Sequence, residues 1–204
     1  MIRIIDYGLG NVGAFINAYK RLGFPAGRAR TPFELEDADK IILPGVGAFD
    51  EAATLLMESG MRRELDELVL KKKIPVLGVC VGMQLLAAGS DEGIMNGLNW
   101  IPGRVRAFKT NPKSDRLCTP HMGWNDIHGD TTKNIISGIE ASARFYFLHS
   151  YFYDCENNDN VLAVTEYGLK FASIIVHENI YGVQFHPEKS HHFGQHLLKN
   201  FALL

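Results

Sequence analysis

The sequence predicts an α/β fold in which a mostly parallel sheet is covered by helices on both faces. Two observations lead to this prediction. In the first half of the chain, short apolar runs rich in β-branched residues alternate with longer stretches of helical periodicity, an order typical of parallel strands joined by helices. In the second half, apolar runs follow one another with only polar turns between them, which is typical of antiparallel strands added to the sheet.

The first half contains three predicted strands, each followed by a helical pattern. The strands cover residues 1–7, 40–47 and 74–80. The first helix carries apolar residues at helical spacing from Phe15 to Leu22 and ends near Gly23, because glycine favours the end of a helix. The second pattern covers 49–72 with a break at Ser59 and Gly60, and the third starts over 82–88.

The second half contains four predicted strands and a closing helix. The strands cover residues 144–153, 160–167, 171–179 and 180–186, and the helix covers 191–204. With 204 residues, no internal repeat and no linker-like stretch, the chain is predicted to form a single domain over residues 1–204.

Composition and charge exclude several classes of function. The formal net charge is −2 and no basic stretch is prominent, so we expect no nucleic-acid partner. Three widely spaced cysteines argue against a disulfide framework and for a reducing compartment. The chain starts without a signal-peptide pattern and holds no apolar run of membrane-spanning length. These observations predict a cytoplasmic protein with no membrane partner.

The stretch LGVCVGMQLL places Cys80 between a predicted strand and a predicted helix, with glycines two residues before and two after it. This spacing matches a nucleophile elbow, in which the nucleophile lies on a strained strand-to-helix turn. The start of the helix would favour a thiolate and offer N–H groups to an oxyanion. The alternative is a small buried cysteine that only packs in the core.

A cysteine nucleophile needs a base, and the base needs an orienting group. His186 and Glu188 follow the last predicted strand and flank Pro187, so the carboxylate can accept the second ring N–H of the histidine. The alternative is a surface turn that carries both residues by chance. The turn after the second strand, LPGVGAFD, has two glycines and permits an exposed backbone N–H; alternatively it is a simple strand-to-helix turn. All three segments fall at the carboxyl ends of predicted strands, where sites gather in doubly wound sheets.

Together these segments resemble a class I (triad) glutamine amidotransferase domain. PGVGAF, GVCVGMQLL and QFHPEKS carry this resemblance, and DYGLGN, PHMGWN and FYFLHSYF make the chain similar to the glutaminase subunit of imidazole glycerol phosphate synthase. The resemblance covers essentially the whole chain. It implies a flavodoxin-like fold, no cofactor, and hydrolysis of glutamine to glutamate and ammonia.

The resemblance also implies the role of each site residue. Cys80 would attack the amide, His186 would transfer protons and Glu188 would orient His186, while the N–H groups of Val46 and Val81 would form the oxyanion hole. The residues implied to bind glutamine are Gly45, Gly47, Gln84, Glu92, His149, Ser150 and Tyr151. Alternatively, Gln84 faces solvent on its helix and Glu92 is an ordinary loop acid.

The resemblance implies a partner, a (βα)8-barrel synthase subunit that receives the ammonia, and an isolated chain that is a poor glutaminase. The residues expected at the interface are Asn11, Pro120, Met122, Gly123, Trp124, Asn125 and Lys189. Trp124 and Met122 are suitable anchors; the alternative is that Trp124 belongs to the core. His191 and His192 are adjacent at a helix start, and we predict no metal site there.

Two features leave the ammonia acceptor open. The nucleophile motif has valines at 79 and 81 where the family usually has isoleucine and leucine. The segments 91–93, 145–155 and 186–192 resemble a branch of second copies found beside surface-polysaccharide genes, where the ammonia is thought to amidinate a sugar.

Two other functions remain as alternatives for the whole chain. One is a different γ-glutamyl hydrolase that acts without a partner, and the other is a non-catalytic binding module with the same fold.

Overall fold

The computed structural model describes residues 1–108, 118–132 and 134–204. Within these ranges, ten strands form one sheet and two form a smaller one. The large sheet contains β1 (Ile2–Ile5), β2 (Ala26–Ala29), β3 (Lys40–Gly45), β4 (Val76–Cys80), β5 (Gly103–Ala107), β7 (His128–Gly129), β9 (Tyr151–Cys155), β10 (Val161–Tyr167), β11 (Leu169–His177) and β12 (Ile180–Val183). The small sheet pairs β6 (His121–Asp126) with β8 (Arg144–His149).

The parallel part of the large sheet has the order β2-β1-β3-β4-β12. This is the order of a flavodoxin-like doubly wound sheet, in which sites form at the carboxyl ends of the strands. Every residue of β4 is buried, as expected for a strand covered on both faces. The prediction of a mostly parallel sheet in this half is therefore confirmed.

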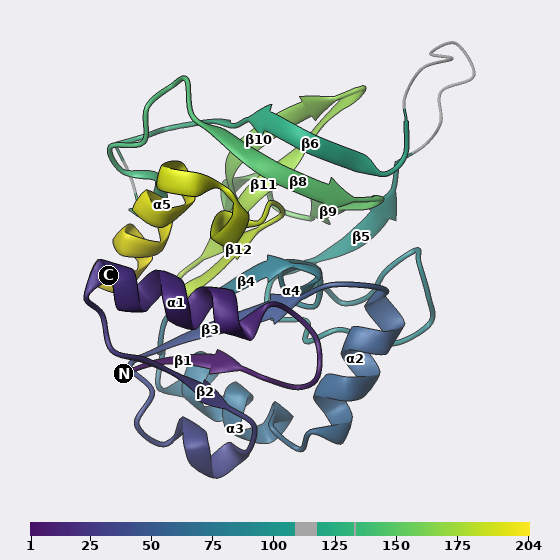
Figure 1. The fold of residues 1–204 in the computed structure, drawn as a ribbon. Coiled ribbons are helices and arrows are strands. Elements are labelled where there is room, and N and C mark those ends of the chain that lie inside the picture. The colour runs from purple at the N-terminus through teal and green to yellow at the C-terminus, as the bar shows by residue number, and fades with distance from the viewer. Residues whose placement is uncertain (109–117, 133) are drawn as a thin grey trace.

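The helices cover the parallel strands on both sides (Figure 1). Their bounds are α1 (Val12–Leu22), α2 (Phe49–Glu58), α3 (Arg62–Asp66), α4 (Val81–Gln84) and α5 (His191–Leu203). The helices α1 and α5 lie together on one side of the parallel strands, and α2 and α3 lie on the other. Two glycines with positive φ confirm predicted boundaries: Gly23 ends α1 at φ 79°, and Gly60 follows α2 at φ 70°.

The antiparallel strands of the second half extend the large sheet, as predicted. β11 pairs with both β10 and β12, and β9 pairs with β5 and β11. The strand β12 is also parallel to β4, so the two halves of the chain share one sheet. Their buried apolar side chains form one continuous cluster. A single domain over residues 1–204 stays a prediction.

The predicted single strand over 144–153 is wrong. It is two strands, because β8 pairs with β6 in the small sheet while β9 pairs with β5 in the large one. The change of partner occurs at Ser150, a bend between them. Alternate side chains stay buried through the bend, from Phe145 and Phe147 to Tyr153, so the sequence pattern does not reveal it.

The predicted helix over 82–88 is shorter than expected, since α4 ends at Gln84. The carbonyls of Leu85 and Leu86 accept hydrogen bonds from the amides of Leu98 and Trp100, at 2.7 and 2.9 Å. These carbonyls therefore bond to the following loop rather than to a further helical turn. The strands β2, β5, β6 and β7 were not predicted. In the described part of the chain, every helix is too short or too polar to cross a bilayer.

Candidate active site

Cys80 lies at the turn where β4 ends and α4 begins. Its backbone has φ 55° and ψ −112°, a conformation that side-chain-bearing residues rarely adopt and that stores strain at functional sites. The strand, the strained residue and the helix that follows reproduce the local geometry of a nucleophile elbow. The same conformation is not needed for a cysteine that merely fills the core.

Three glycines allow the backbones around this turn to approach closely. A Cβ atom on Gly78 would lie 2.6 Å from the carbonyl oxygen of Gly82, and one on Gly82 would lie 1.9 Å from that of Leu43. A Cβ atom on Gly45 would lie 2.4 Å from the amide nitrogen of Gly82. Any larger residue at these positions would push β3, β4 and α4 apart. Gly45 therefore packs against the turn and is not among the residues that line the pocket.

His186 and Glu188 meet directly after β12. The Nδ1 atom of His186 lies 2.9 Å from Oε1 of Glu188, and each side chain is 3 % exposed. The second carboxylate oxygen of Glu188 is buried without a hydrogen-bond partner among the described residues. Ser190 anchors the segment, because its Oγ donates to the carbonyl of His186 and accepts from the amide of Tyr146. The pair is thus a fixed buried unit and not a surface turn.

The surroundings of His186 favour its charged form. Burial acts to lower the pKa of His186, but the interactions of its ring with Cys80 and with Glu188 outweigh burial and raise that pKa to about 10. The imidazole therefore interacts with both the sulfur atom of Cys80 and the carboxylate of Glu188. A cysteine that interacts with a histidine, which in turn interacts with an acid, has the arrangement of a nucleophile, its base and an orienting group.

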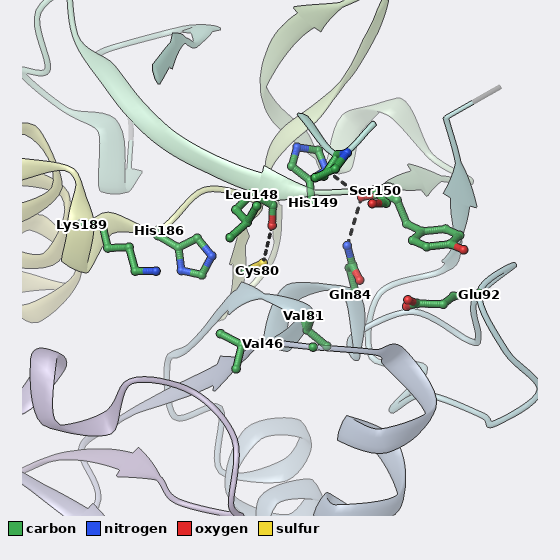
Figure 2. A pocket seen from close by; sticks show the side chains of 13 residues that line it. Val46, Cys80, Val81, Gln84, Glu92, Leu148, His149, Ser150, His186 and Lys189 are labelled. Atoms are coloured by element: carbon green, nitrogen blue, oxygen red, sulfur yellow. Dashed lines mark hydrogen bonds between the residues drawn. The ribbon is translucent and has the colours of Figure 1, made fainter. Parts of the chain in front are cut away.

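A pocket of about 280 Å³ opens over Cys80 (Figure 2). Its walls bring together residues from the ends of β3 and β4, from α4, and from the segment that joins β8 to β9. The lining residues are Val46, Gly47, Cys80, Val81, Gln84, Glu92, Pro120, Leu148, His149, Ser150, Tyr151, His186 and Lys189. Val46 and Val81, the predicted oxyanion-hole residues, lie beside Cys80. Glu188 is not part of the lining.

Gln84 and Glu92 both have structural partners at the pocket wall. Gln84 is 2 % exposed, and its Nε2 donates to the carbonyl of Tyr151 at 3.1 Å and to Oε1 of Gln184 at 3.2 Å. The alternative of a solvent-facing Gln84 is therefore wrong. Glu92 accepts a hydrogen bond from the amide of Phe49 at 2.9 Å, so it caps the start of α2 in addition to lining the pocket.

His149 belongs to a buried pair of histidines. Its Nδ1 lies 2.8 Å from the carbonyl oxygen of Tyr151, and its Nε2 lies 3.0 Å from Nδ1 of His121. Burial lowers the pKa of His149 to about 3 and that of His121 to about 4, so both rings are neutral near pH 7. His121 and Gln184 are not among the residues predicted from the sequence. The alternation of β6 offers a signal for His121, which shares a face with Asn125.

The residues expected at a partner interface fall in different places. Met122 and Trp124 are 65 % and 43 % exposed on the outer face of β6, and Trp124 stacks on His191 with ring centroids 5.0 Å apart. The alternative that Trp124 is core is therefore wrong. Asn125 lies on the opposite face of β6, where its Nδ2 donates to the carbonyl of Glu166.

The other expected interface residues lie near the pocket, at a helix start or within β6. Pro120 and Lys189 line the pocket, and the ammonium of Lys189 lies 5.7 Å from the ring centre of Tyr146. Asn11 is exposed and caps α1 through its Oδ1. Gly123 has φ 132° in the middle of β6.

No group of three or more His, Cys, Asp or Glu side chains within the described ranges is arranged to hold a metal ion.

The fold and the pocket are those of a glutamine amidotransferase. The family model for "Glutamine amidotransferase class-I" matches residues 3–204. A relative from Bdellovibrio bacteriovorus, named imidazole glycerol phosphate synthase subunit HisH, is 58 % identical over 202 residues, which cover 99 % of each chain. A relative of the same name from Leptospira borgpetersenii is 48 % identical over 204 residues, the full length of both chains. The chain belongs to the class-I glutamine amidotransferase family, within the group of relatives named imidazole glycerol phosphate synthase subunit HisH.

A solved structure titled "Crystal structure of glutamine amidotransferase" has the same fold. Its TM-score is 0.76 at 19 % identity, and the match covers 100 % of this chain and 99 % of that chain. The predicted fold class is therefore confirmed, as is the prediction that the chain is an enzyme of the glutamine amidotransferase class.

Proposed function

We propose that the chain hydrolyses the side-chain amide of glutamine with Cys80 as the nucleophile, His186 as the general acid and base, and Glu188 as the group that orients His186. One observation carries this proposal. Cys80 sits strained at the floor of a pocket, and the ring that interacts with it is held from behind by a buried carboxylate. A packing role would require neither the strain nor the pair.

The reaction proceeds in two halves. The sulfur of Cys80 attacks the amide carbon of glutamine, and a tetrahedral oxyanion forms. His186 then gives its proton to the leaving nitrogen, so that ammonia departs and a thioester remains. In the second half, His186 takes a proton from water and the hydroxide attacks the thioester. The C–S bond then breaks, so that the glutamate carboxyl group is released and the thiolate–imidazolium pair is restored.

The oxyanion would be stabilised by the N–H groups of Val46 and Val81. Both residues line the pocket beside Cys80, and Val81 begins α4, where backbone N–H groups lack helical partners. Donors fixed before the reaction need no rearrangement when charge develops on the oxygen.

Glutamine would bind along the far wall of the pocket. Both Nε2 hydrogens of Gln84 are already donated, which leaves its amide oxygen as an acceptor for the substrate ammonium. The carboxylate of Glu92 adds a negative charge on the same side. Gly47 and the segment His149–Ser150–Tyr151 complete the wall; of the residues predicted to bind glutamine, Gly45 alone supports the wall from outside it.

The ammonia would pass to a (βα)8-barrel synthase subunit bound near the mouth of the pocket, in imidazole glycerol phosphate formation. Support comes from the names of the relatives, which describe a subunit of that synthase, and from the exposed apolar side chains of Met122 and Trp124. A surface-polysaccharide sugar as the acceptor is not favoured, because the two relatives carry the synthase name. A cytoplasmic location stays part of this proposal.

Imidazole glycerol phosphate synthase belongs to histidine biosynthesis, and its barrel subunit acts on a ribonucleotide of that pathway. The test is glutamate release by the purified chain, alone and with its native barrel partner, in the presence and absence of this ribonucleotide. We expect low activity from the chain alone and strong stimulation by partner and ribonucleotide together. Full activity without the partner would contradict the coupled mechanism. Stimulation by the partner but not by the ribonucleotide would move the acceptor to another pathway.

Replacing the nucleophile tests the chemistry itself. Cys80→Ala is expected to abolish glutamate release in the stimulated complex, because no other thiol lines the pocket in the described part of the chain. Cys118→Ala is the matched control, since Cys118 is exposed and its loss should leave turnover unchanged. Turnover that survives in Cys80→Ala would show that the nucleophile is misassigned.

A further inference from the structure

A continuous line of buried and partly buried polar groups runs from β6 to the nucleophile. Asn125 Nδ2 lies 3.3 Å from Nε2 of His121, and the His121–His149 pair continues to the carbonyl of Tyr151. That carbonyl also accepts from Gln84, which bonds to Gln184. Gln184 Nε2 lies 3.9 Å from the sulfur of Cys80. This series of contacts, called the polar chain below, comprises Asn125, His121, His149, Tyr151, Gln84, Gln184 and Cys80.

The direction of each hydrogen bond in the first part of the polar chain follows from its end. A carbonyl only accepts, so Nδ1 of His149 must carry a hydrogen and donate it to Tyr151. His149 is neutral, which makes its Nε2 an acceptor, and Nδ1 of His121 must therefore be the donor. His121 is neutral as well, so its Nε2 accepts from the amide of Asn125. One tautomer of each ring satisfies every contact.

The polar chain cannot carry a proton from end to end. The carbonyl of Tyr151 accepts from His149 on one side and from Gln84 on the other, so the donor direction reverses there. A relay would need each group to donate onward. The polar chain can only hold its members in place.

The ring of His121 is itself held firmly. It is 3 % exposed and lies between the rings of Phe147 and Tyr167, with centroid distances of 4.7 and 4.0 Å and interplanar angles of 23° and 21°. A planar ring stacked on both faces has little freedom to rotate, which gives its Nδ1–H a fixed direction. The ring of His121 can therefore hold the ring of His149 in a fixed position through this N–H.

We propose that His121, which does not line the pocket, is a positioning residue for glutamine binding: it fixes the tautomer and ring of His149, and so the carbonyl of Tyr151 that orients the amide of Gln84 at the pocket wall. This inference rests on the proposed glutaminase function. It assigns to the inner face of β6 a role separate from the outer face that carries Met122 and Trp124.

The test compares His121→Phe with His121→Asn in the stimulated complex. Phenylalanine keeps the stacked ring but removes both nitrogens, whereas Asn places an amide donor close to the position of Nδ1. We expect His121→Phe to raise KM for glutamine roughly tenfold, about the effect of one lost hydrogen bond, while kcat falls far less. His121→Asn should recover most of the wild-type KM.

The matched control is His128→Phe, the same substitution at an exposed histidine on β7. It should leave both kinetic constants unchanged. An unchanged KM in His121→Phe would overturn the proposal, and so would an equal rise in KM in both His121 variants, since that would indicate packing and not hydrogen bonding. Activity of the wild-type complex and its loss in Cys80→Ala test the glutaminase function separately.

A second measurement does not depend on whether the variants fold. Nitrogen-15 NMR of the isotope-labelled wild-type chain, with the ring signals of His149 assigned by through-bond correlation from its backbone resonances, should show the Nδ1–H tautomer of neutral His149 near pH 7. The Nε2–H tautomer, or a charged ring, would overturn the proposal whether or not the chain proves to be a glutaminase.

Discussion

Burial and the neighbouring groups shift the pKa of His186 in opposite directions. A buried imidazole ordinarily loses its proton easily, yet the contacts with Cys80 and Glu188 raise the pKa of His186 to about 10. The imidazolium is therefore the form present over the neutral pH range. This is the form that can protonate the leaving nitrogen of an amide.

Glu188→Gln tests how far the carboxylate contributes to that charge. The amide is nearly the same size but neutral, so the imidazolium loses stabilisation and the pKa of His186 should fall below its wild-type value of about 10. We expect kcat for glutamine hydrolysis to decrease about 10²-fold, within the range that general acid–base catalysis contributes. An NMR titration of the His186 ring and steady-state kinetics measure the two effects.

The control for this substitution is Glu36→Gln, which neutralises an exposed acid. It should change neither the titration of His186 nor kcat. A His186 pKa that stays near 10 in Glu188→Gln would mean that Cys80 alone maintains the charge.

The sequence predicts Cys80, His186 and Glu188 as the triad because each lies in a short contiguous motif. The elbow is visible as glycines around Cys80, and the pair is separated by one proline. His121 and Gln184 act through partners far along the chain: His121 bonds to His149, 28 positions away, and Gln184 to Gln84, 100 positions away. The alternation along β6 indicates at most that His121 shares a face with Asn125, whereas the partners of His121 and Gln184 follow only from the fold.

At the scale of elements, the junction of β3, β4 and α4 is closed by contacts that only glycine permits. Gly82→Ala is expected to destabilise the chain by about 3 kcal/mol or more, because the new methyl group would lie 1.9 Å from the carbonyl oxygen of Leu43 and backbone must move to make room. Urea denaturation gives the change in the free energy of unfolding.

Gly13→Ala is the matched control for that measurement. Gly13 lies inside α1, and a Cβ atom there would meet nothing within 4 Å. The same added methyl should stabilise the chain by about 0.5–1 kcal/mol, since alanine favours the helix. If Gly82→Ala were no less stable than wild type, the close approach of these elements would be disproved.

The predicted elements that proved correct are those with a strong local pattern. Helices α1 and α5 show clear helical spacing, and β3 and β4 are continuous apolar runs. The short edge strand β2 carries the sequence AGRA, which has neither alternation nor apolar character. It is a strand because its backbone pairs in parallel with β1, from Ala26 to Ala29.

For the whole molecule, the outer face of β6 is the surface that should distinguish the free chain from the assembled enzyme. Trp124→Ala is expected to weaken binding of the barrel partner about 30-fold or more, because a large aromatic at the centre of an interface commonly contributes 2 kcal/mol or more. Thermal unfolding of the free chain should change little, since Trp124 is 43 % exposed. Titration calorimetry measures the affinity.

Met57→Ala serves as the control, because Met57 is 60 % exposed on α2, away from β6. It should leave the affinity unchanged. Equal affinity of wild type and Trp124→Ala would place the partner on another surface. The fold class was predictable at this scale because the order of apolar runs determines how strands and helices can pack, whereas the partner was inferred from resemblance alone.

The bend at Ser150 limits how this protein can vary in length. On one side of it, β8 is in register with β6 from Arg144 to His149, and on the other, β9 is in register with β5 from Tyr151 to Cys155. One inserted or deleted residue would turn the side chains of a whole strand to the opposite face in one of the two sheets. Diversification of this wall of the pocket is therefore restricted to exchanging side chains, while the number of residues in it stays constant.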